Sequence, residues 1–337
     1  MPSFASTLPN VIARHRDAIE DALAAAIASD GSDVVAAARY VMGWEDAGGR
    51  PAESGGKRIR PALALIACEA FGGAPADAMP GAVAIEIVHN FSLVHDEIQD
   101  RDDVRHGRPT AYTVWGEGQA INLGDFLFAR AFQALTRSAT PPGRLIEAVE
   151  CLLRAVEGMI RGQWTDLAFE RRDALTVDEY LVMAEGKTGV LLGAALEIGA
   201  ILGGASRVDA TTMGAWGRKL GLAFQAVDDY LGIWGQETGK PIGADILRKK
   251  KSLPVTFALN DAAAGPFIRA SFEADRQAAD LPRILALLEG CGADGICRDI
   301  ARRFADEASE IAATLELAPA ARRQLQAVGE YFCSRDF

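Results

Sequence analysis

Acidic side chains gather at the end of an apolar helical segment in the first third of the chain. Five carboxylates lie between Asp96 and Asp103, directly after the apolar run of residues 83–94. Asp96 and Asp100 are four residues apart, so on a helix they share one face, one turn apart. A second acidic pair, Asp228-Asp229, follows another apolar segment. Two groups of carboxylates at the ends of apolar helices indicate that a cation lies between them.

A solvated helix end is the simplest alternative for a single acidic cluster. Like charges at helical spacing cost only about 0.2–0.5 kcal/mol per pair on a surface. The apolar flank counts against this alternative, since Phe91, Leu93 and Val94 precede Asp96. Carboxylates that continue a buried face are partly desolvated, and an unpaired buried charge costs on the order of several kcal/mol. Oxygen ligands without an accompanying set of His and Cys indicate Mg²⁺ or a similar hard ion.

A basic segment precedes these acids, with the sequence Gly55-Gly56-Lys57-Arg58-Ile59-Arg60-Pro61. The glycines allow close backbone approach, and a proline suits the first turn of a helix. Three cations then lie at a helix N-terminus, where the helix dipole also favours an anion. A solvated basic loop is the alternative, and this segment alone does not decide between them. Together with Mg²⁺, the pattern indicates a diphosphate ester, and the apolar helices indicate an apolar substrate tail.

Composition excludes several other classes of protein. The chain has 337 residues, a formal net charge of −11 and 49 % hydrophobic residues, which is enough for a sizeable core. An acidic surface argues against general nucleic-acid binding. Five cysteines without a Cys-x-x-Cys pair are typical of reduced thiols in a cytoplasmic protein. Residues 1–9 lack a signal-peptide pattern, and we interpret the apolar stretch 189–204 as a buried core helix, with no stable membrane insertion.

Helical periodicity runs through nearly the whole chain. The expected helices cover residues 8–28, 34–42, 61–71, 82–98, 120–135, 145–167, 177–202, 211–234, 254–260, 281–288, 294–315 and 320–331. Residues 43–56 and 235–252 are expected to be loops and residues 72–80 a turn. No repeat or linker interrupts the pattern. The predicted fold is all-α, a single antiparallel helical bundle over residues 1–337, with the two acidic motifs facing each other across a deep cavity.

The order of the motifs resembles that of the trans-isoprenyl diphosphate synthases, the polyprenyl synthetases. The matching blocks are Gly56-Lys57-Arg58-Ile59-Arg60-Pro61, His95-Asp96-Glu97-Ile98-Gln99-Asp100, Arg105-His106-Gly107-Arg108-Pro109-Thr110, Gly124-Asp125, Lys187-Thr188-Gly189, Phe224-Gln225-x-x-Asp228-Asp229 and Gly239-Lys240-Pro241. Each block is weak alone, whereas seven blocks in order are specific. The resemblance implies an isoprenoid-synthase-like bundle with a central active-site cavity. It also implies a homodimer that condenses isopentenyl diphosphate with an allylic diphosphate, head to tail and with Mg²⁺.

The resemblance also implies roles for the matching positions. Asp96, Asp100 and Asp228 would hold Mg²⁺ and, with Lys187, form the catalytic set. The residues expected to bind isopentenyl diphosphate are Lys57, Arg60, His89 and His106. The residues expected around the allylic diphosphate are Arg105, Lys187, Thr188, Gln225, Lys240 and Lys250, with Lys249 as the alternative to Lys250.

The sequence departs from the family pattern at three positions. Glu97 replaces an aspartate, but the first and last acids of that motif are the expected ligands. His106 stands where a second arginine is usual, and a histidine is only partly charged near neutral pH. Weaker binding of isopentenyl diphosphate, or a different acceptor, would follow. Gly232 stands where many members have a third aspartate, a feature that this chain shares with some medium-chain synthases.

Product length is expected to depend on Phe91 and Ser92. Phe91 lies five residues before Asp96 and is expected to form the floor of the space in which the product grows. The surrounding pattern resembles geranylgeranyl diphosphate synthases most, with a farnesyl product as the next expectation. A terpene cyclase or an atypical prenyltransferase on the same fold stays open because of His106. A non-catalytic partner subunit of a synthase is the other alternative, against which the retained acids and bases argue.

Overall fold

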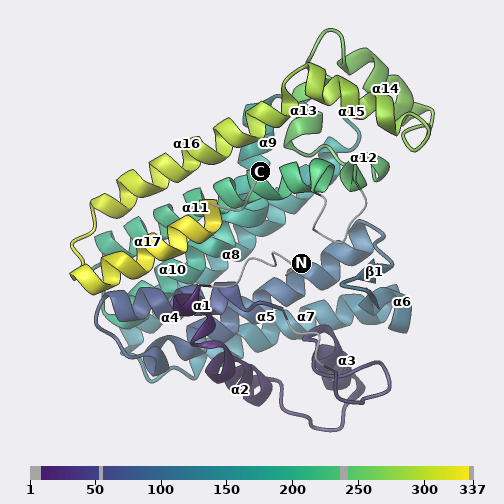
Figure 1. Ribbon diagram of the computed structural model, residues 1–337. Coiled ribbons are helices and arrows are strands. Elements are labelled where there is room, and N and C mark those ends of the chain that lie inside the picture. The colour runs from purple at the N-terminus through teal and green to yellow at the C-terminus, as the bar shows by residue number, and fades with distance from the viewer. Residues whose placement is uncertain (1–8, 53–55, 236–241, 334–337) are drawn as a thin grey trace, which may run out of the picture.

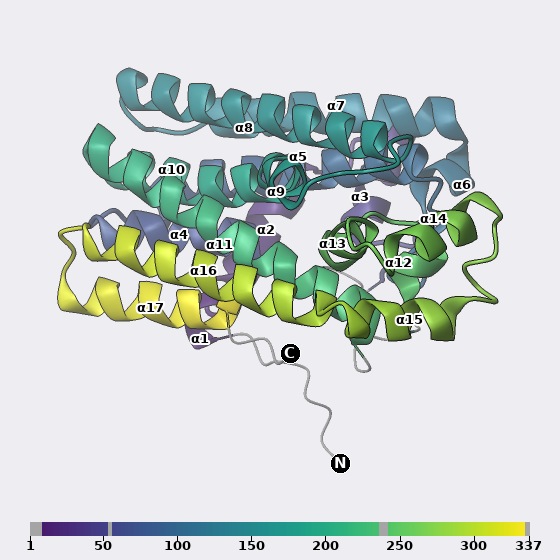
Figure 2. The same cartoon turned by 90° about the horizontal axis from the view of Figure 1, so that it is seen from above.

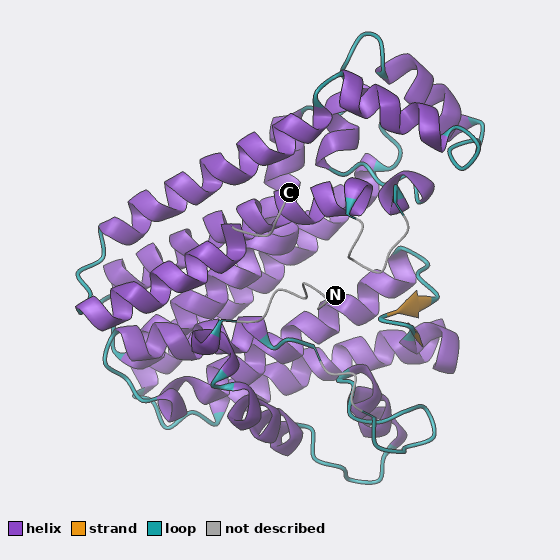
Figure 3. Ribbon diagram, viewed as in Figure 1, coloured by secondary structure: helices purple, strands orange, loops and turns teal. Residues whose placement is uncertain are grey.

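The computed structural model describes residues 9–52, 56–235 and 242–333, and nearly all of their regular secondary structure is helical (Figure 3). The helices are α1 Asn10–Ala13, α2 Arg16–Ala26, α3 Asp33–Val41, α4 Ile59–Ala70, α5 Pro75–Gln99, α6 Ala111–Trp115, α7 Glu117–Thr136, α8 Pro142–Phe169, α9 Val177–Ala184, the π-helix η1 Glu185–Gly189, α10 Val190–Gly203, α11 Arg207–Trp234, α12 Ala244–Leu247, α13 Leu253–Leu259, α14 Gly265–Glu273, α15 Leu281–Gly290, α16 Ala293–Ala313 and α17 Pro319–Cys333. A single hairpin pairs the two-residue strands β1 Val104–Arg105 and β2 Arg108–Pro109 in the described part of the chain. The all-α prediction is confirmed.

The long helices pack side by side in layers (Figures 1 and 2). Viewed from above, α7 and α8 form one outer layer and α16 and α17 form the opposite one, with α4, α5, α10 and α11 between them. α10 contacts α4, α5, α8 and α11. The run Val177–Gly203 has the length and apolar composition to cross a membrane, yet 78 % of its most apolar window is buried. This burial confirms that residues 189–204 form a core helix.

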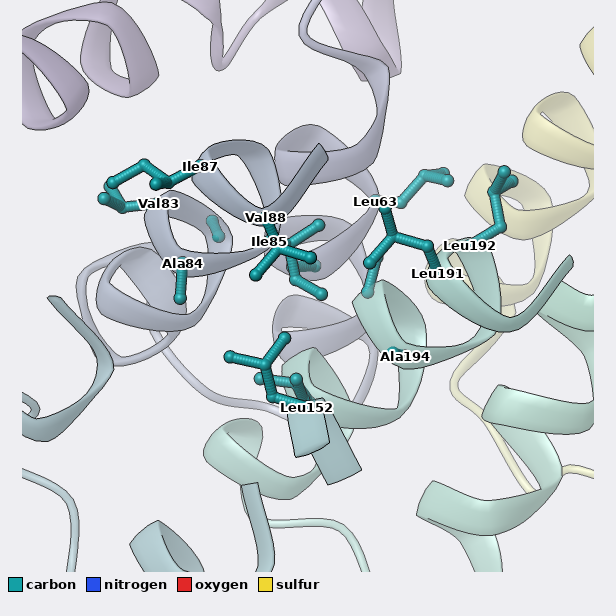
Figure 4. Packing of buried hydrophobic residues seen from close by; sticks show 14 of the residues in the cluster. Leu63, Val83, Ala84, Ile85, Ile87, Val88, Leu152, Leu191, Leu192 and Ala194 are labelled. Carbon is teal, nitrogen blue, oxygen red and sulfur yellow. The ribbon is translucent and has the colours of Figure 1, made fainter. Parts of the chain in front are cut away.

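Apolar side chains from four helices meet in the centre of the bundle. Figure 4 shows Leu63 of α4, Ile85 and Val88 of α5, Leu152 of α8 and Leu191 of α10 in this cluster, and all are almost fully buried. Burying one such side chain stabilises the fold by about 1.5–3 kcal/mol. The cluster therefore fixes the helix α5, whose last turn carries the first acidic motif.

α11 links the separate clusters of buried side chains. Trp216 belongs to the largest cluster, Val227 to a second one shared with α9, α13 and α16, and Ile233 to a third one formed with α12–α15. The second acidic motif lies between Val227 and Ile233. Because the helix is buried on both sides of it, this motif sits on a rigid support.

Several local expectations were wrong. The helix expected over residues 8–28 is divided between α1 and α2, where Arg14 and His15 both contact Glu69 of α4. α5 begins inside the expected turn, because Pro75 opens it and Asp77 accepts a hydrogen bond from Ala74 N–H at 2.9 Å. The hairpin of β1 and β2 and the helix α14 were not expected. Short α12 interrupts the loop expected over residues 235–252.

Candidate active site

A cavity of about 310 Å³ opens between the C-terminal end of α5 and the second half of α11. Its acidic lining comes from α5 and the residues that follow it, from α8 and from α11, and its basic lining comes from α4, β1, η1 and the segment between α12 and α13. The charged lining residues are Arg60, Asp96, Asp100, Asp102, Arg105, Asp166, Lys187, Asp228, Asp229, Arg248, Lys250 and Lys251. The two acidic motifs thus border one cavity, as the sequence predicted.

The first acidic motif divides between the cavity and the protein interior. Asp96 and Asp100 line the cavity from successive turns of α5. The pKa of Asp96 is raised to about 6; burial is the largest cause, Asp100 and Asp166 also raise it, and the positive charges of Lys187 and Arg105 oppose them. A carboxylate with a raised pKa has too little positive charge around it, and a bound cation would restore the balance.

Glu97 points away from these two acids. Its carboxylate lies 2.8 Å from Arg105 Nε, and burial is the largest cause of its raised pKa. Arg105 belongs to the β1–β2 hairpin, so this ion pair holds the hairpin against α5. Glu97 therefore stands apart from the candidate metal ligands, which explains how a glutamate fits where an aspartate was expected.

The second acidic motif places two adjacent aspartates in different environments. Asp228 is exposed in the cavity. Asp229 is buried and accepts hydrogen bonds from Tyr180 OH, from Gln225 Nε2 at 2.8 Å and from Leu253 N–H at 2.8 Å. Burial raises the pKa of Asp229 to about 7, against the lowering effect of these donors. Sequence reasoning had not assigned Tyr180 or Asp229 a role.

The π-helix η1 presents Lys187 and Thr188 to the cavity. Lys187 Nζ lies 2.6 Å from Asp166 Oδ2 on α8, and Thr188 Oγ1 donates to Gln225 Oε1 at 2.7 Å. Burial lowers the pKa of Lys187, but Asp166 and the α5 acids outweigh it and leave the pKa raised. Short π-helical segments often occur at functional sites. A Cβ atom on Gly162 would lie only 2.4 Å from Lys187 N, so a glycine is needed for η1 to approach α8 this closely.

A smaller cavity of about 120 Å³ adjoins the first one, and His89, Leu93 and Arg105 line both. Arg60 Nη1 lies 3.1 Å from His89 Nε2. Burial, and then the positive charge of Arg60, lowers the pKa of His89 well below 6.5, so the neutral ring accepts this hydrogen bond. Arg60 Nε is buried without a partner among the described residues, which leaves a donor for an anion. His106 lines the smaller cavity.

The cations of the basic segment, residues 55–61, lie in different surroundings. Arg58 adopts a left-handed backbone conformation, with φ 49°, and is 4 % exposed. Its guanidinium lies 2.8 Å from carboxylate oxygens of both Glu20 and Glu86. Arg58 borders the smaller cavity, but these two ion pairs already occupy its guanidinium, which indicates a structural role. Lys57 is exposed and lies outside both cavity linings, although the resemblance implies that it binds substrate.

The three lysines before α13, residues 249–251, also lie in different surroundings. Lys250 lines the larger cavity, whereas Lys249 pairs with Asp275. Lys251 Nζ donates to backbone carbonyls at the end of α8, including Phe169 O at 2.6 Å. This arrangement favours Lys250 over Lys249 as the residue that faces substrate. Lys240, the other lysine implied by the resemblance, lies outside the described residues.

Phe91 does not occupy its expected place. Ser92 and Leu93 line the larger cavity, whereas the ring of Phe91 packs against Phe128 of α7, with centroids 5.5 Å apart, and against His95. Five residues correspond to about 140° around a helix, so Phe91 cannot share the face of Asp96. The expectation that its ring forms the floor of this cavity is therefore wrong. A role in product length stays a prediction.

The acidic lining suits a hard cation without forming a closed cage. Within residues 9–52, 56–235 and 242–333, no three Asp, Glu, His or Cys side chains converge closely enough to hold a metal ion by themselves. Mg²⁺ usually binds one or two carboxylates and completes its shell with water and substrate phosphates. Carboxylates from α5 and α11 on one cavity fit that mode of binding.

Comparison with known proteins identifies the family. The polyprenyl synthetase family model matches residues 46–288. A (2E,6E)-farnesyl diphosphate synthase of Mycobacterium tuberculosis is 40 % identical over 305 residues, which cover 88 % of this chain and 84 % of the relative. A geranylgeranyl diphosphate synthase of the same species is 40 % identical over 307 residues, or 89 % and 86 %.

A solved structure agrees with this assignment. The polyprenyl synthetase of Streptomyces coelicolor superposes with a TM-score of 0.91 at 40 % identity, over 96 % of this chain and 98 % of that one. Similarity of sequence and fold over nearly the whole chain confirms the resemblance seen in the motifs. The chain belongs to the polyprenyl synthetase family.

Proposed function

We propose that the chain is a Mg²⁺-dependent trans-prenyltransferase that condenses isopentenyl diphosphate with an allylic diphosphate. A short- or medium-chain trans-prenyl diphosphate would result, with geranylgeranyl favoured and farnesyl next. The observation that carries the proposal is one cavity in which Asp96, Asp100 and Asp228 face Lys187 and Lys250. Acids and cations in this arrangement suit a metal-bound diphosphate better than either alone.

The proposed reaction joins an allylic diphosphate, which loses its diphosphate group, to isopentenyl diphosphate, whose double bond supplies the electrons. The allylic C–O bond breaks, and diphosphate leaves with the electron pair. The double bond of isopentenyl diphosphate then forms the new C–C bond, and the proton lost afterwards passes to the departed diphosphate. Asp96, Asp100 and Asp228 would hold Mg²⁺, which when bound supplies charge neutralisation on the leaving group. Lys187 and Lys250 add fixed positive charge where negative charge develops.

We assign the remaining polar groups by cavity. Arg105, Thr188 and Gln225 border the larger cavity and would contact the allylic diphosphate, together with Lys240. His89 and His106 border the smaller one, where isopentenyl diphosphate would bind. Arg60 contacts His89 from the larger cavity, and Lys57, which is exposed outside both linings, would complete the site. The unpartnered Arg60 Nε supports an anion at the junction of the two cavities.

The apolar part of the larger cavity would hold the growing hydrocarbon chain. Leu93, Met159, Leu191 and Phe224 line it, from α5, α8, α10 and α11. Enclosure by apolar side chains favours a prenyl tail and excludes water from a reactive carbocation.

A second copy of this chain would cover the outer face of α8. Ile146, Leu153, Ile160 and Trp164 follow one another at helical spacing and are 47–78 % exposed. Apolar side chains repeated along one helix face are typical of helix–helix interfaces. We therefore propose a homodimer, and Trp164→Glu should shift the sedimentation coefficient toward that of a monomer. The free thiols of Cys68, Cys151, Cys291 and Cys297 support our proposal of a cytoplasmic location.

A product assay tests the catalytic proposal. Purified protein with Mg²⁺ and isopentenyl diphosphate is supplied with dimethylallyl, geranyl or farnesyl diphosphate, and EDTA is added to a control. We expect metal-dependent geranylgeranyl diphosphate. Hydrocarbon or alcohol formed without consumption of isopentenyl diphosphate would instead identify a terpene cyclase. Activity that needs an added partner protein would identify a non-catalytic subunit.

A further inference from the structure

The two adjacent aspartates of α11 differ in what their carboxylates can still bind. Asp228 is exposed in the cavity, whereas Asp229 is 5 % exposed. Asp229 Oδ1 accepts from Gln225 Nε2, and its Oδ2 accepts from both Tyr180 OH and Leu253 N–H. Neighbouring residues of a helix point about 100° apart, so Asp228 is open to the cavity while Asp229, at its wall, is largely enclosed by protein. Both carboxylate oxygens of Asp229 therefore already accept hydrogen bonds from the protein, and Oδ2 accepts two.

One of these donors connects Asp229 to the cavity wall. Leu253 is the first residue of α13 and directly follows residues 250–252, which we call the lysine arm. Lys251 Nζ donates to Phe169 O at 2.6 Å and to Glu170 O at 3.2 Å, at the end of α8. The lysine arm is thus fixed at two points, to α11 by Asp229 and to α8 by Lys251.

Beside and between these two anchors, the lysine arm presents two polar side chains to the cavity, Lys250 and Ser252. Lys250 is exposed and lines it. Ser252 also lines it, is only 4 % exposed, and its Oγ has no partner within the part of the chain that the structure describes. A buried hydroxyl without a partner is costly, so a site for an incoming hydrogen-bond acceptor or donor is indicated.

We propose that Asp229 is a positioning residue that holds the lysine arm, and that Ser252 Oγ is a further contact for the allylic diphosphate. Asp229 would then not be a ligand of Mg²⁺, although it is adjacent to Asp228. This inference rests on the function proposed above, because it concerns the diphosphate end of the same cavity.

Matched amide variants distinguish a positioning residue from a metal ligand. Asp228→Asn should raise the Mg²⁺ concentration for half-maximal activity at least tenfold. Asp229→Asn can still accept from Tyr180 OH and Leu253 N–H, so its Mg²⁺ requirement should stay within twofold of the unmodified chain. An equal rise in both variants would overturn the positioning role.

Removing the hydrogen bonds that Asp229 accepts should weaken the binding of the allylic diphosphate and leave the binding of isopentenyl diphosphate nearly unchanged. In Asp229→Leu the KM for the allylic diphosphate should rise at least tenfold, while the KM for isopentenyl diphosphate stays within twofold. Tyr180→Phe, which removes one donor and keeps the ring, should give a smaller rise. An unchanged allylic KM in folded Asp229→Leu contradicts the proposal. Ser252→Ala should raise the same KM about fivefold, and no change there would remove Ser252 from the site.

Limited proteolysis tests the anchor without catalysis. Trypsin cleaves after lysine, and residues 249–251 are three consecutive lysines. Without substrate or metal, Asp229→Leu should be cut there at least tenfold faster than the unmodified chain, and Asp229→Asn within twofold. Cleavage elsewhere in the chain reports global unfolding. If the unmodified chain forms no prenyl product but the proteolysis rates are as expected, the proposed function is wrong while Asp229 still holds the lysine arm. If all variants are cleaved at the same rate, Asp229 does not hold the lysine arm.

Discussion

Lys187 Nζ lies 2.6 Å from Asp166 Oδ2, so an acid on α8 fixes the direction of the cation that η1 presents to the cavity. We expect Lys187→Met to lower kcat/KM for the allylic diphosphate by about 10²–10³-fold, the effect of removing one charge-stabilising donor. Asp166→Asn should cost less, because it keeps a hydrogen-bond acceptor for Lys187. Steady-state kinetics with both variants measure which loss of kcat/KM is greater. A greater loss in Asp166→Asn would mean that Asp166 itself contacts the metal or the substrate.

Metal dependence should separate Asp96 from its neighbour Glu97. Asp96→Asn should reduce turnover by about 100-fold or more and raise the Mg²⁺ requirement, because a carboxylate on the cavity becomes an amide. Glu97→Gln is the matched control, since Glu97 pairs with Arg105 and stands apart from Asp96. Its Mg²⁺ titration should follow that of the unmodified chain. A similar Mg²⁺ shift in both variants would show that Glu97 also contributes to the metal site.

Product length should respond to Ser92, which lines the cavity one turn before Asp96. Ser92→Phe places a ring in the space for the hydrocarbon chain, so the main product should become shorter by one five-carbon unit. Chromatography of the dephosphorylated products measures this change. An unaltered product distribution would mean that the chain grows along another wall.

Phe91→Ala tests the expectation derived from the sequence. Deleting a buried ring leaves a gap beside Phe128 and should cost about 3–5 kcal/mol of unfolding free energy. We expect longer products, because Phe91 adjoins the cavity residue Ser92 in the sequence and its ring fills space beside α7. Chemical denaturation measures the stability, and product chromatography measures the length. Loss of stability with the same products would limit Phe91 to packing.

Burial of His89 should appear in the pH dependence of stability. The folded pKa of His89 is lowered well below 6.5, whereas the unfolded chain takes up a proton near 6.5. Stability is therefore complete above pH 6.5 and is lost as the pH falls below it, with a slope of at most about 1.4 kcal/mol per pH unit. His89→Gln should flatten unfolding free energies measured between pH 7 and 5. An unchanged slope would mean that His89 is protonated in the folded state.

His106→Arg restores the cation that the family pattern expects beside the smaller cavity. An arginine is charged at all working pH values and binds phosphate through two parallel hydrogen bonds. The KM for isopentenyl diphosphate should fall about three- to tenfold, with little change in the KM for the allylic diphosphate. Initial-rate kinetics for both substrates measure this difference. A higher KM would show that the histidine is adapted to this chain's own acceptor.

Sequence motifs predicted the residues of the cavity more accurately than helical periodicity predicted where the helices begin and end. Asp96, Asp100 and Asp228 were expected on one cavity from their spacing and their apolar flanks, and they line it. The break between α1 and α2 was missed; the residues at it, Arg14 and His15, contact Glu69, which is distant in the sequence. Helical periodicity predicts that a segment is helical, but contacts between segments determine where each helix begins and ends.

The sequence by itself determined the all-α class, the family and the order of the chemical motifs, because those depend on local residue types and their spacing. Tertiary structure decided which member of each adjacent set is left open to the cavity. Arg58, Glu97, Asp229 and Lys251 are held by ion pairs or hydrogen bonds to other parts of the chain, although Asp229 and Lys251 also border the larger cavity, which Arg60, Asp96, Asp228 and Lys250 line as well. Successive residues of a helix point about 100° apart, so neighbours in the sequence face different surroundings, and only the packing of the bundle determines what those are.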